Sequence, residues 1–166
     1  MLCWKCLAPL PEGATLCGDC GAKPPRKDLI RLATQQDYPA CAAIFLRSRV
    51  SGFTWLPPSR FTLEDFEPSI VDEEVWVAER EGRIVGFASI FLEANFLHNL
   101  FVDPGSQRAG VGVLLLEAFL ARVKRPALLN CLAANQRALQ FYQKRGWEKH
   151  EQDEEDFGPY WTMIKR

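Results

Sequence analysis

The sequence predicts an α+β fold built on one mixed β-sheet, with elements in the order β-α-α-β-β-β-α-β-α-β-β. Short apolar runs of strand length alternate with longer segments in which apolar residues recur at helical spacing. A chain of 166 residues, 48% hydrophobic and 25% charged, can form one well-packed core and a small appendage. We expect a cysteine-rich segment over 1–22, a linker over 23–28 and one larger domain over 29–166.

Four of the six cysteines lie in the first twenty residues, as Cys3-x2-Cys6 and Cys17-x2-Cys20. Two such pairs in a reducing compartment are typical of a structural Zn²⁺ site with four thiolate ligands, and a pair of disulfides is the alternative. So short a segment cannot bury an apolar core, so metal would supply most of its folding free energy. The sequence therefore predicts a small zinc ribbon over 1–22. Two prolines make the linker that follows semi-rigid.

The first half of the larger domain begins with a short apolar strand over 29–32. Thr34 is a suitable N-cap for a helix that runs to about Arg47 or Arg49. A loop with two prolines follows over 52–60, and 63–66 is a candidate for a second, short helix. Two apolar runs around Glu81-Gly82 then predict a β-hairpin over 75–92.

The second half predicts a strand over 96–102 and a helix that ends before Pro126. A buried strand follows over 128–132. Asn135 caps the next helix, which ends at Lys144-Arg145 with Gly146 after it. Two final strands are expected from Trp147 onward and over 160–164.

Charge and hydropathy restrict the partners. A formal net charge of −1 gives no general attraction to nucleic acid or to an anionic membrane. The apolar run over 111–121 contains Glu117 and is too short to span a bilayer, and the first residues do not form a signal peptide. We expect a cytoplasmic protein without membrane contact, for which nucleic acid is not the expected partner.

The most informative segment is a strand, a turn and a helix over 100–112, in which Gln107-x-x-Gly110-x-Gly112 opens the helix. Small residues here let backbone N–H groups approach an anion, and the helix dipole favours phosphate. This pattern predicts a site for the pyrophosphate of a cofactor. The alternative is a plain strand–helix joint whose glycines serve close packing.

The pattern resembles motif A of the GNAT N-acetyltransferase superfamily, in which this loop holds the pyrophosphate of acetyl-CoA. The resemblance covers roughly Leu29 to the end of the chain and implies direct acetyl transfer from the thioester to an amine. It also implies that the strand before the turn splays from its parallel neighbour and pairs with the pantetheine arm. The implied cofactor contacts are Leu100, Phe101 and Val102 on the strand, and Gln107, Arg108, Ala109, Gly110, Val111 and Gly112 in the turn and helix.

A second motif, Asn135-x-x-Ala138-x-x-Phe141-Tyr142-x-x-x-Gly146-Trp147, resembles motif B of the same superfamily, with Trp where Phe is commoner. The resemblance places Asn135, Ala138, Phe141 and Tyr142 near the pantetheine arm and the thioester sulfur. A phenol is acidic enough to reprotonate a thiolate within hydrogen-bond reach. Tyr142 is therefore the candidate general acid, and ordinary aromatic packing is the alternative.

Two residues are candidates for the general base that takes a proton from the amine. His98 lies two residues before Leu100, so it shares that strand face unless a bulge turns it away. Glu93, acting through water, is the other candidate, and a half-buried structural role is the alternative for His98. Cys131 and Cys41 are better explained as small buried residues than as nucleophiles.

The acceptor is predicted only as a class. Trp55, Phe61 and Phe66 could line an apolar wall, and the acids over 151–156 form either a rim that attracts a cationic amine or a solvated turn. A small-molecule amine is the first expectation and a peptide or protein amine the second. The competing hypothesis is a non-catalytic acyl-CoA-binding or regulatory protein whose zinc ribbon docks to a protein or nucleic-acid partner.

Overall fold

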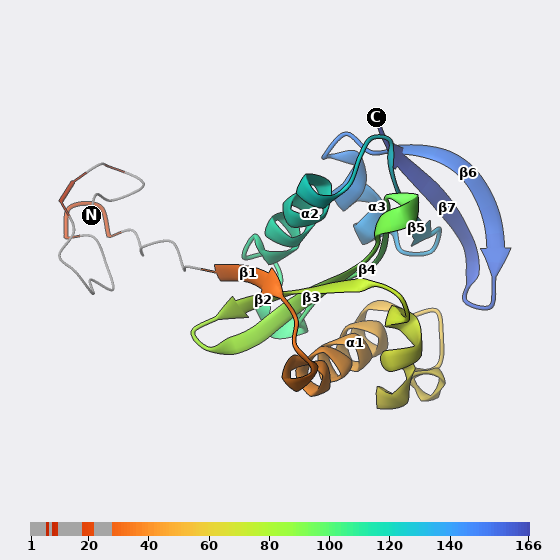
Figure 1. Cartoon of the computed structure of the whole chain (residues 1–166), viewed down its shortest axis with the longest axis horizontal. Coiled ribbons are helices and arrows are strands. Elements are labelled where there is room, and N and C mark those ends of the chain that lie inside the picture. Colours follow the sequence, from red (N-terminus) through yellow and green to blue (C-terminus); the bar gives the residue numbers. More distant parts are fainter. Residues whose placement is uncertain (1–5, 7, 10–17, 22–27) are drawn as a thin grey trace.

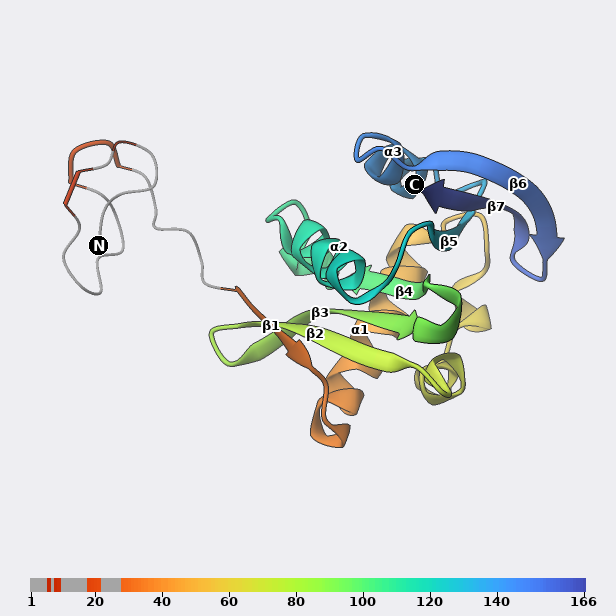
Figure 2. The ribbon, with the colours of Figure 1, turned by 45° about the horizontal axis from the view of Figure 1, so that its top comes forward.

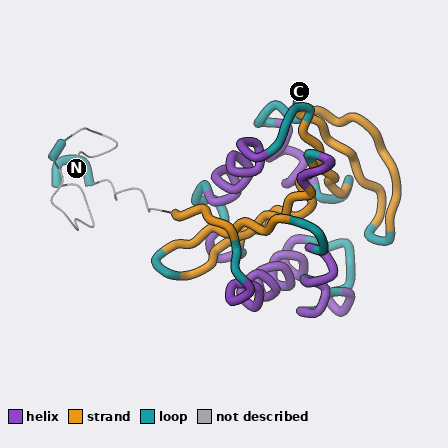
Figure 3. Tube along the Cα trace, viewed as in Figure 1, coloured by secondary structure: helices purple, strands orange, loops and turns teal. Residues whose placement is uncertain are grey.

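The computed structural model describes residues 6, 8, 9, 18–21 and 28–166. Over 28–166 it contains a seven-stranded sheet with helices on both faces (Figures 1 and 3). The strand order is β1-β2-β3-β4-β5-β7-β6, and β4 and β5 form the parallel pair within it. The described part of the chain contains no helix that is long and apolar enough to cross a membrane.

The first half of the sheet is an antiparallel meander. Its strands are β1 (Asp28–Leu32), β2 (Glu74–Arg80), β3 (Arg83–Phe91) and β4 (Phe96–Val102). A left-handed Glu81-Gly82 turn joins β2 to β3, as the sequence predicts. At the edge of the sheet, the Arg80 guanidinium forms a bidentate pair with the buried Asp28 carboxylate, which holds β1 on β2.

The segment between β1 and β2 contains the helix α1 (Tyr38–Gly52) and a series of 3-10 turns. Thr34 is the N-cap of the turn η1 (Gln35–Asp37), and its N–H donates to the Asp37 carboxylate. Helix α1 begins after this turn, at Tyr38. The short helix expected over 63–66 is a 3-10 turn, and a further 3-10 turn with a proline in its first two residues flanks it on each side. The three turns are η2 (Pro58–Arg60), η3 (Leu63–Asp65) and η4 (Glu67–Ile70).

The second half agrees with the predicted order of elements. Two 3-10 turns flank β4: η5 (Leu92–Ala94) precedes it and η6 (Pro104–Ser106) follows it. The elements after η6 are α2 (Val111–Arg122), β5 (Ala127–Leu132), α3 (Gln136–Gln143), β6 (Glu148–Glu155) and β7 (Gly158–Lys165). All eight residues of β6 are exposed, and the hairpin that it forms with β7 curves away from the rest of the sheet (Figure 2).

The core lies on both faces of the sheet. One cluster joins the sheet to α2 and α3 through Leu115, Phe119 and Trp147, and the other packs α1 and η4 through Phe45 and Phe66. Helix α2 approaches the sheet closely at Gly86, where a Cβ atom would lie 3.1 Å from the Val111 side chain and 3.2 Å from the Leu115 side chain.

The parallel strands β4 and β5 are paired only near their first residues and separate after them. Strands β4 and β5 pair only at Phe96 with Leu128 and at Leu97 with Leu129. Beyond these pairs, the β5 side of 98–102 has no strand partner among the described residues. The splay expected from the resemblance is therefore present, and it exposes backbone groups in the middle of a sheet.

Candidate active site

A cleft of about 740 Å³ lies where β4 and β5 separate. Of the sequence-predicted site residues, it brings together six, from strand β4 and from helix α3 with its N-cap. These are His98, Leu100, Phe101, Asn135, Ala138 and Tyr142. Val102, Phe141, Glu93 and the turn over 107–112 lie outside its lining.

Tyr142 reaches the cleft from α3. Its ring packs edge-on against Phe141 and Trp147, at centroid distances of 5.1 and 6.0 Å. Burial raises the pKa of Tyr142 above its ordinary value, and the neighbouring Cys131 adds to the shift. No hydrogen bond joins its hydroxyl to another residue in the described part of the chain. The ring is thus held by packing at the wall of the cleft.

Asn135 begins α3 as predicted. Its side-chain oxygen accepts the N–H of Ala138 at 3.1 Å, which caps the helix. The amide nitrogen of the same side chain has no partner among residues 28–166, and Asn135 lines the cleft. The cap therefore occupies the oxygen of the Asn135 amide and leaves its N–H groups without a partner in the described domain.

The turn before α2 contains two residues in the left-handed backbone region. Arg108 has a φ of 64° and Gly110 a φ of 84°. Gly110 is the N-cap of α2, and the Gln107 side chain donates to the Val102 carbonyl oxygen at 3.2 Å, which ties the turn to the end of β4. The N–H groups at the start of α2 are left without helical partners.

Phe141 connects this turn to α3. A Cβ atom on Gly112 would lie 3.6 Å from the Phe141 ring, and the Arg145 guanidinium lies 4.0 Å above the centre of that ring. Phe141 therefore packs beside the predicted pyrophosphate turn rather than in the cleft.

His98 occupies a β-bulge. Ser89 pairs with Asn99 and Ile90 with Leu97, so His98 is the extra residue of β4. The bulge breaks the alternation that would place His98 on the face of Leu100. Leu100 packs toward the α2 cluster, whereas the Nδ1 atom of His98 lies 2.6 Å from Glu73 Oε1, beside η4. Glu73 raises the pKa of His98, and Glu155 adds to the shift.

The other expected base, Glu93, lies in η5 and is exposed outside the cleft. Cys131 lines the cleft, but burial raises the pKa of its thiol to about 12. A thiol with that pKa stays protonated near neutral pH, which argues against a nucleophile.

Aromatic and charged side chains form the far end of the cleft. The Phe53 ring stacks on Trp55 at 5.0 Å, and the Trp55 Nε1–H donates to the Phe157 carbonyl oxygen at 3.3 Å. Of the three aromatic residues expected in the acceptor wall, Trp55 and Phe61 pack against Phe53, which lines the cleft, but they lie outside the lining themselves. Phe66 is buried in the core under α1, so it does not line the cleft either.

The acidic run over 151–156 forms strand β6 and the start of its turn, and only its last two residues, Glu155 and Asp156, line the cleft. Glu64 is a third carboxylate there, and Asp65 is paired with the buried Arg49 at 3.0 Å. Arg60 is a cation at the same end, over the Phe157 ring, but the three carboxylates outnumber it, so this end of the cleft favours a cationic group.

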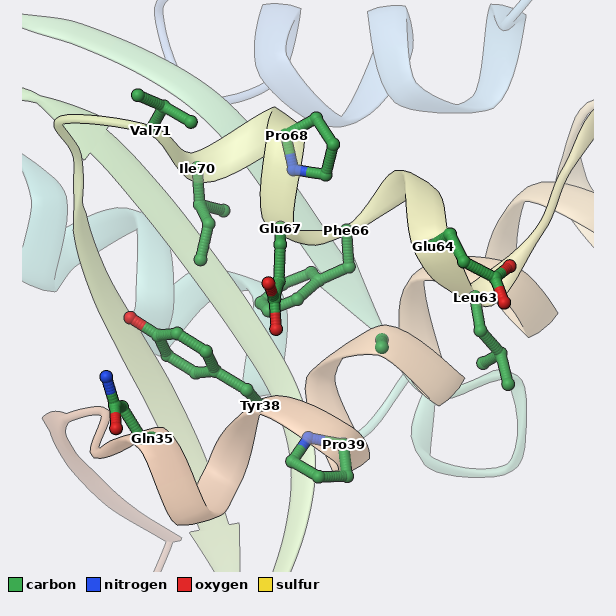
Figure 4. A pocket seen from close by; sticks show the side chains of 11 residues that line it. Gln35, Tyr38, Pro39, Leu63, Glu64, Phe66, Glu67, Pro68, Ile70 and Val71 are labelled. Carbon is green, nitrogen blue, oxygen red and sulfur yellow. The ribbon is translucent and has the colours of Figure 1, made fainter.

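A second, shallower hollow of about 1140 Å³ lies between the start of α1 and the turns η3 and η4 (Figure 4). Tyr38 and Phe66 meet edge-on in it, with ring centres 5.5 Å apart. Glu64 and Pro68 line both hollows. None of the expected catalytic residues lies in this second one.

Of the expected zinc ligands, Cys3 and Cys17 lie outside the described residues, whereas Cys6 and Cys20 lie within them. Among the residues that the structure does describe, no group of three or more potential metal ligands is found.

Sequence reasoning missed Glu73 and Phe157. Glu73 lies in the turn between η4 and β2, 25 residues from His98, where no periodicity marks a buried side chain. Phe157 follows the acidic run, and a single aromatic residue in a charged turn was the one available signal.

Comparison with known proteins agrees with this geometry. The acetyltransferase (GNAT) domain family matches residues 59–165. The peptidyl-lysine N-acetyltransferase YiaC of Escherichia coli is 30% identical over 143 residues, which cover 81% of this chain and 94% of YiaC.

Solved structures show the same fold. Apo YjaB from Escherichia coli is 26% identical with a TM-score of 0.70, covering 83% of this chain and 97% of YjaB. The PaiA N-acetyltransferase of Thermoplasma acidophilum, solved with coenzyme A, is 19% identical with a TM-score of 0.70 and covers 84% and 99%. With its splayed strands, glycine turn and family match, the chain belongs to the GNAT acetyltransferase family and is an acyltransferase.

Proposed function

We propose that the protein is an acetyl-CoA-dependent N-acetyltransferase that transfers the acetyl group directly from the thioester to an amine. The observation that carries this proposal is the Tyr142 hydroxyl, which has no partner among the described residues and lies in the cleft between the splayed strands. The thioester supplies an activated acetyl group, and the residues of this chain bind it, polarise it and move protons.

Three groups of residues would hold acetyl-CoA. The backbone N–H groups over 108–112 bind the pyrophosphate, since the left-handed turn directs them toward one anion site. On the β5 side of Leu100, Phe101 and Val102, where no strand pairs, backbone groups bind the pantetheine amides as an added strand would. The Val102 carbonyl oxygen already accepts from Ser48 and Gln107. Asn135 donates through its free amide nitrogen.

Tyr142 acts as general acid toward the leaving thiolate. Its raised pKa keeps the phenol protonated at neutral pH. Transfer to sulfur is not prevented, because the same dry surroundings raise thiol pKa values as well, as they do for Cys131. His98 acts as general base, and it accepts the proton that the attacking amine must lose.

The acceptor is a cationic primary amine. Glu64, Glu155 and Asp156 give the open end of the cleft a negative field that concentrates such a group. A lysine side chain of a peptide or protein is the first candidate, since YiaC acts on peptidyl lysine. A small-molecule amine is the second.

We also propose that Cys3, Cys6, Cys17 and Cys20 form a structural zinc ribbon over 1–22, joined by 23–28 to the transferase domain over 29–166. Its support is the Cys-x2-Cys spacing. Purified protein should contain one Zn²⁺ per chain, and the double variant Cys17→Ser/Cys20→Ser should contain none.

The test of the transferase activity follows free thiol release from acetyl-CoA across lysine peptides and small amines. Tyr142→Phe should lower kcat by about a hundredfold or more while acetyl-CoA binds with unchanged Kd. Tyr160→Phe, on β7 outside the cleft lining, is the matched control and should keep wild-type kcat. Wild-type turnover by Tyr142→Phe would reject the acid role, and coenzyme A binding without any acceptor-dependent thiol release would favour the non-catalytic alternative.

A further inference from the structure

Glu73 is an unusual carboxylate. It lies in the turn between η4 and β2, and its side chain is only 8% exposed. One oxygen lies 2.6 Å from His98 Nδ1, and the other is buried without a hydrogen-bond partner in the described residues. Burying a carboxylate is costly unless a charged or polar partner compensates it, and His98 is the partner that Glu73 has.

The backbone around His98 fixes this contact from two sides. The bulge turns His98 out of the β4 alternation, and the next residue, Asn99, is buried. The Asn99 side chain donates to Ser89 Oγ at 2.8 Å and to the Ser69 carbonyl oxygen at 3.2 Å. These bonds tie β3, β4 and η4 together, so the position of His98 relative to the turn that contains Glu73 is set by buried groups.

We propose that Glu73 is a positioning residue that holds His98 in the tautomer and orientation of the general base. The proposal rests on the proposed function and deepens it. Because the carboxylate takes the hydrogen bond of Nδ1, neutral His98 carries its proton there and leaves the lone pair on Nε2. His98 lines the cleft that contains Tyr142, and besides Glu73 its ring interacts with the backbone of Ser69.

The protons balance as follows. His98 Nε2 accepts one proton from the ammonium acceptor and releases it to solvent, and the amine nitrogen then attacks the carbonyl carbon. The C–N bond forms, the C–S bond breaks, and the amide nitrogen loses its second proton to solvent. Tyr142 gives its proton to sulfur and is reprotonated from solvent, so each turnover releases one net proton.

One charged group besides Glu73 raises the pKa of His98, and other charged groups line the same cleft. Glu155, at the end of β6, raises the pKa of His98, as does the backbone of Ser69 in η4. The Phe96 ring lies 6.2 Å away and is uncharged. Across the cleft lie Glu64, Asp156 and the Arg60 guanidinium, and the pair of Arg49 with Asp65.

The dyad can be measured without turnover. The chain contains two histidines, so a nuclear magnetic resonance titration resolves His98 once His150→Gln identifies the other signal. Glu73→Gln, which keeps the shape of the side chain, should move the pKa of His98 down toward its ordinary value. Glu74→Gln, the neighbour that pairs with Arg122 instead, is the matched control and should leave it unchanged.

Kinetics then separate positioning from a merely structural role. Because His98 must be neutral to accept a proton, kcat should rise with pH through its raised pKa. Glu73→Gln should move this limb to lower pH and lower the plateau about tenfold or more, whereas Glu74→Gln should do neither. Glu73→Asp, which keeps the charge, should restore part of the wild-type limb.

The outcomes distinguish the proposals. A His98 titration that is the same in wild type and Glu73→Gln overturns the dyad, whatever the enzyme does. A wild-type kcat and acid limb in Glu73→Gln or in His98→Gln also overturns it, while acetyl transfer by the wild type leaves the proposed function intact. An absence of acetyl transfer by the wild type to any amine refutes the proposed function, while the titration still decides the contact.

Discussion

Two glycines of one turn have different physical reasons to be glycine. Gly110 has a φ of 84°, which side chains rarely adopt, although a Cβ atom there would meet nothing within 4 Å. Gly112 lies inside α2, and a Cβ atom would make ordinary contacts of 3.6 and 3.7 Å with Phe141 and Val102. The sequence motif treats the two alike, but only the first is required by the backbone.

Gly110→Ala should therefore cost about 1 kcal/mol of stability and raise the KM for acetyl-CoA, because strain shifts the N–H groups of the turn. Gly112→Ala should be neutral or stabilising by up to about 1 kcal/mol, as alanine is the better helix former. Urea unfolding of both variants and acetyl-CoA titration check this. Equal destabilisation by the two alanines would show that the positive φ of Gly110 is not the reason for glycine at that position.

The candidate site could be predicted at residues whose role follows from local sequence. Asn135 caps α3 and Gly110 opens α2, as their positions beside apolar periodic segments indicate. His98 and Glu73 could not be paired in this way, because their contact depends on a one-residue bulge and on the path of a turn. Both are products of tertiary packing that no local pattern encodes.

Among the elements, the start of α1 shows how local and long-range contacts combine. Asp37 accepts from the Thr34 N–H and also pairs with Arg31 on β1, at 2.8 Å. The hydrogen bond from Arg31 is the main cause that lowers the pKa of Asp37 to about 2. Thr34 was predicted as the cap, but the ion pair that strengthens it comes from the neighbouring strand.

A depressed carboxylate pKa contributes stability above the unfolded-state pKa of about 4, and that stability is lost as pH falls toward 2. Asp37→Asn should thus reduce stability at pH 7 by about 1 kcal/mol, since Arg31 is partly exposed. The difference from wild type should shrink below pH 4 in denaturant titrations. Glu148→Gln, whose pair with Arg166 is exposed, is the control, and a pH-independent effect of Asp37→Asn would contradict the ion-pair account.

The order of elements could be read from apolar runs because each strand and helix buries one face. The segment over 57–70 was less predictable, since it forms three 3-10 turns of which the helix expected over 63–66 is only the middle one. Strand β6 has no buried face, so the acidic run lacks the alternation of apolar and polar residues that predicts a strand. It is a strand because β7 pairs with it, and its charges protect an edge of the sheet.

Over the described domain as a whole, the acids are distributed unevenly with respect to the cleft. Glu155 and Asp156 line it, whereas Glu151 and Asp153, in the same exposed hairpin, do not. A charge acts on an approaching ammonium group according to distance and screening, so these two pairs of acids form a matched comparison. Comparing the two pairs shows whether the acids attract the acceptor or only keep the edge strand solvated.

The double variant Glu155→Gln/Asp156→Asn should raise the KM for a cationic acceptor about fourfold at low ionic strength. The reason is that each charge contributes roughly 0.4 kcal/mol at about 10 Å in water, which is about twofold. Glu151→Gln/Asp153→Asn should have less effect, and 1 M salt should remove the difference, because the screening length falls to about 3 Å. Because Glu155 also raises the pKa of His98, KM is measured at a pH well above that pKa, where His98 is neutral in every variant. An equal rise in both double variants, or none in either at low salt, would mean that these acids serve the edge of the sheet and not the acceptor.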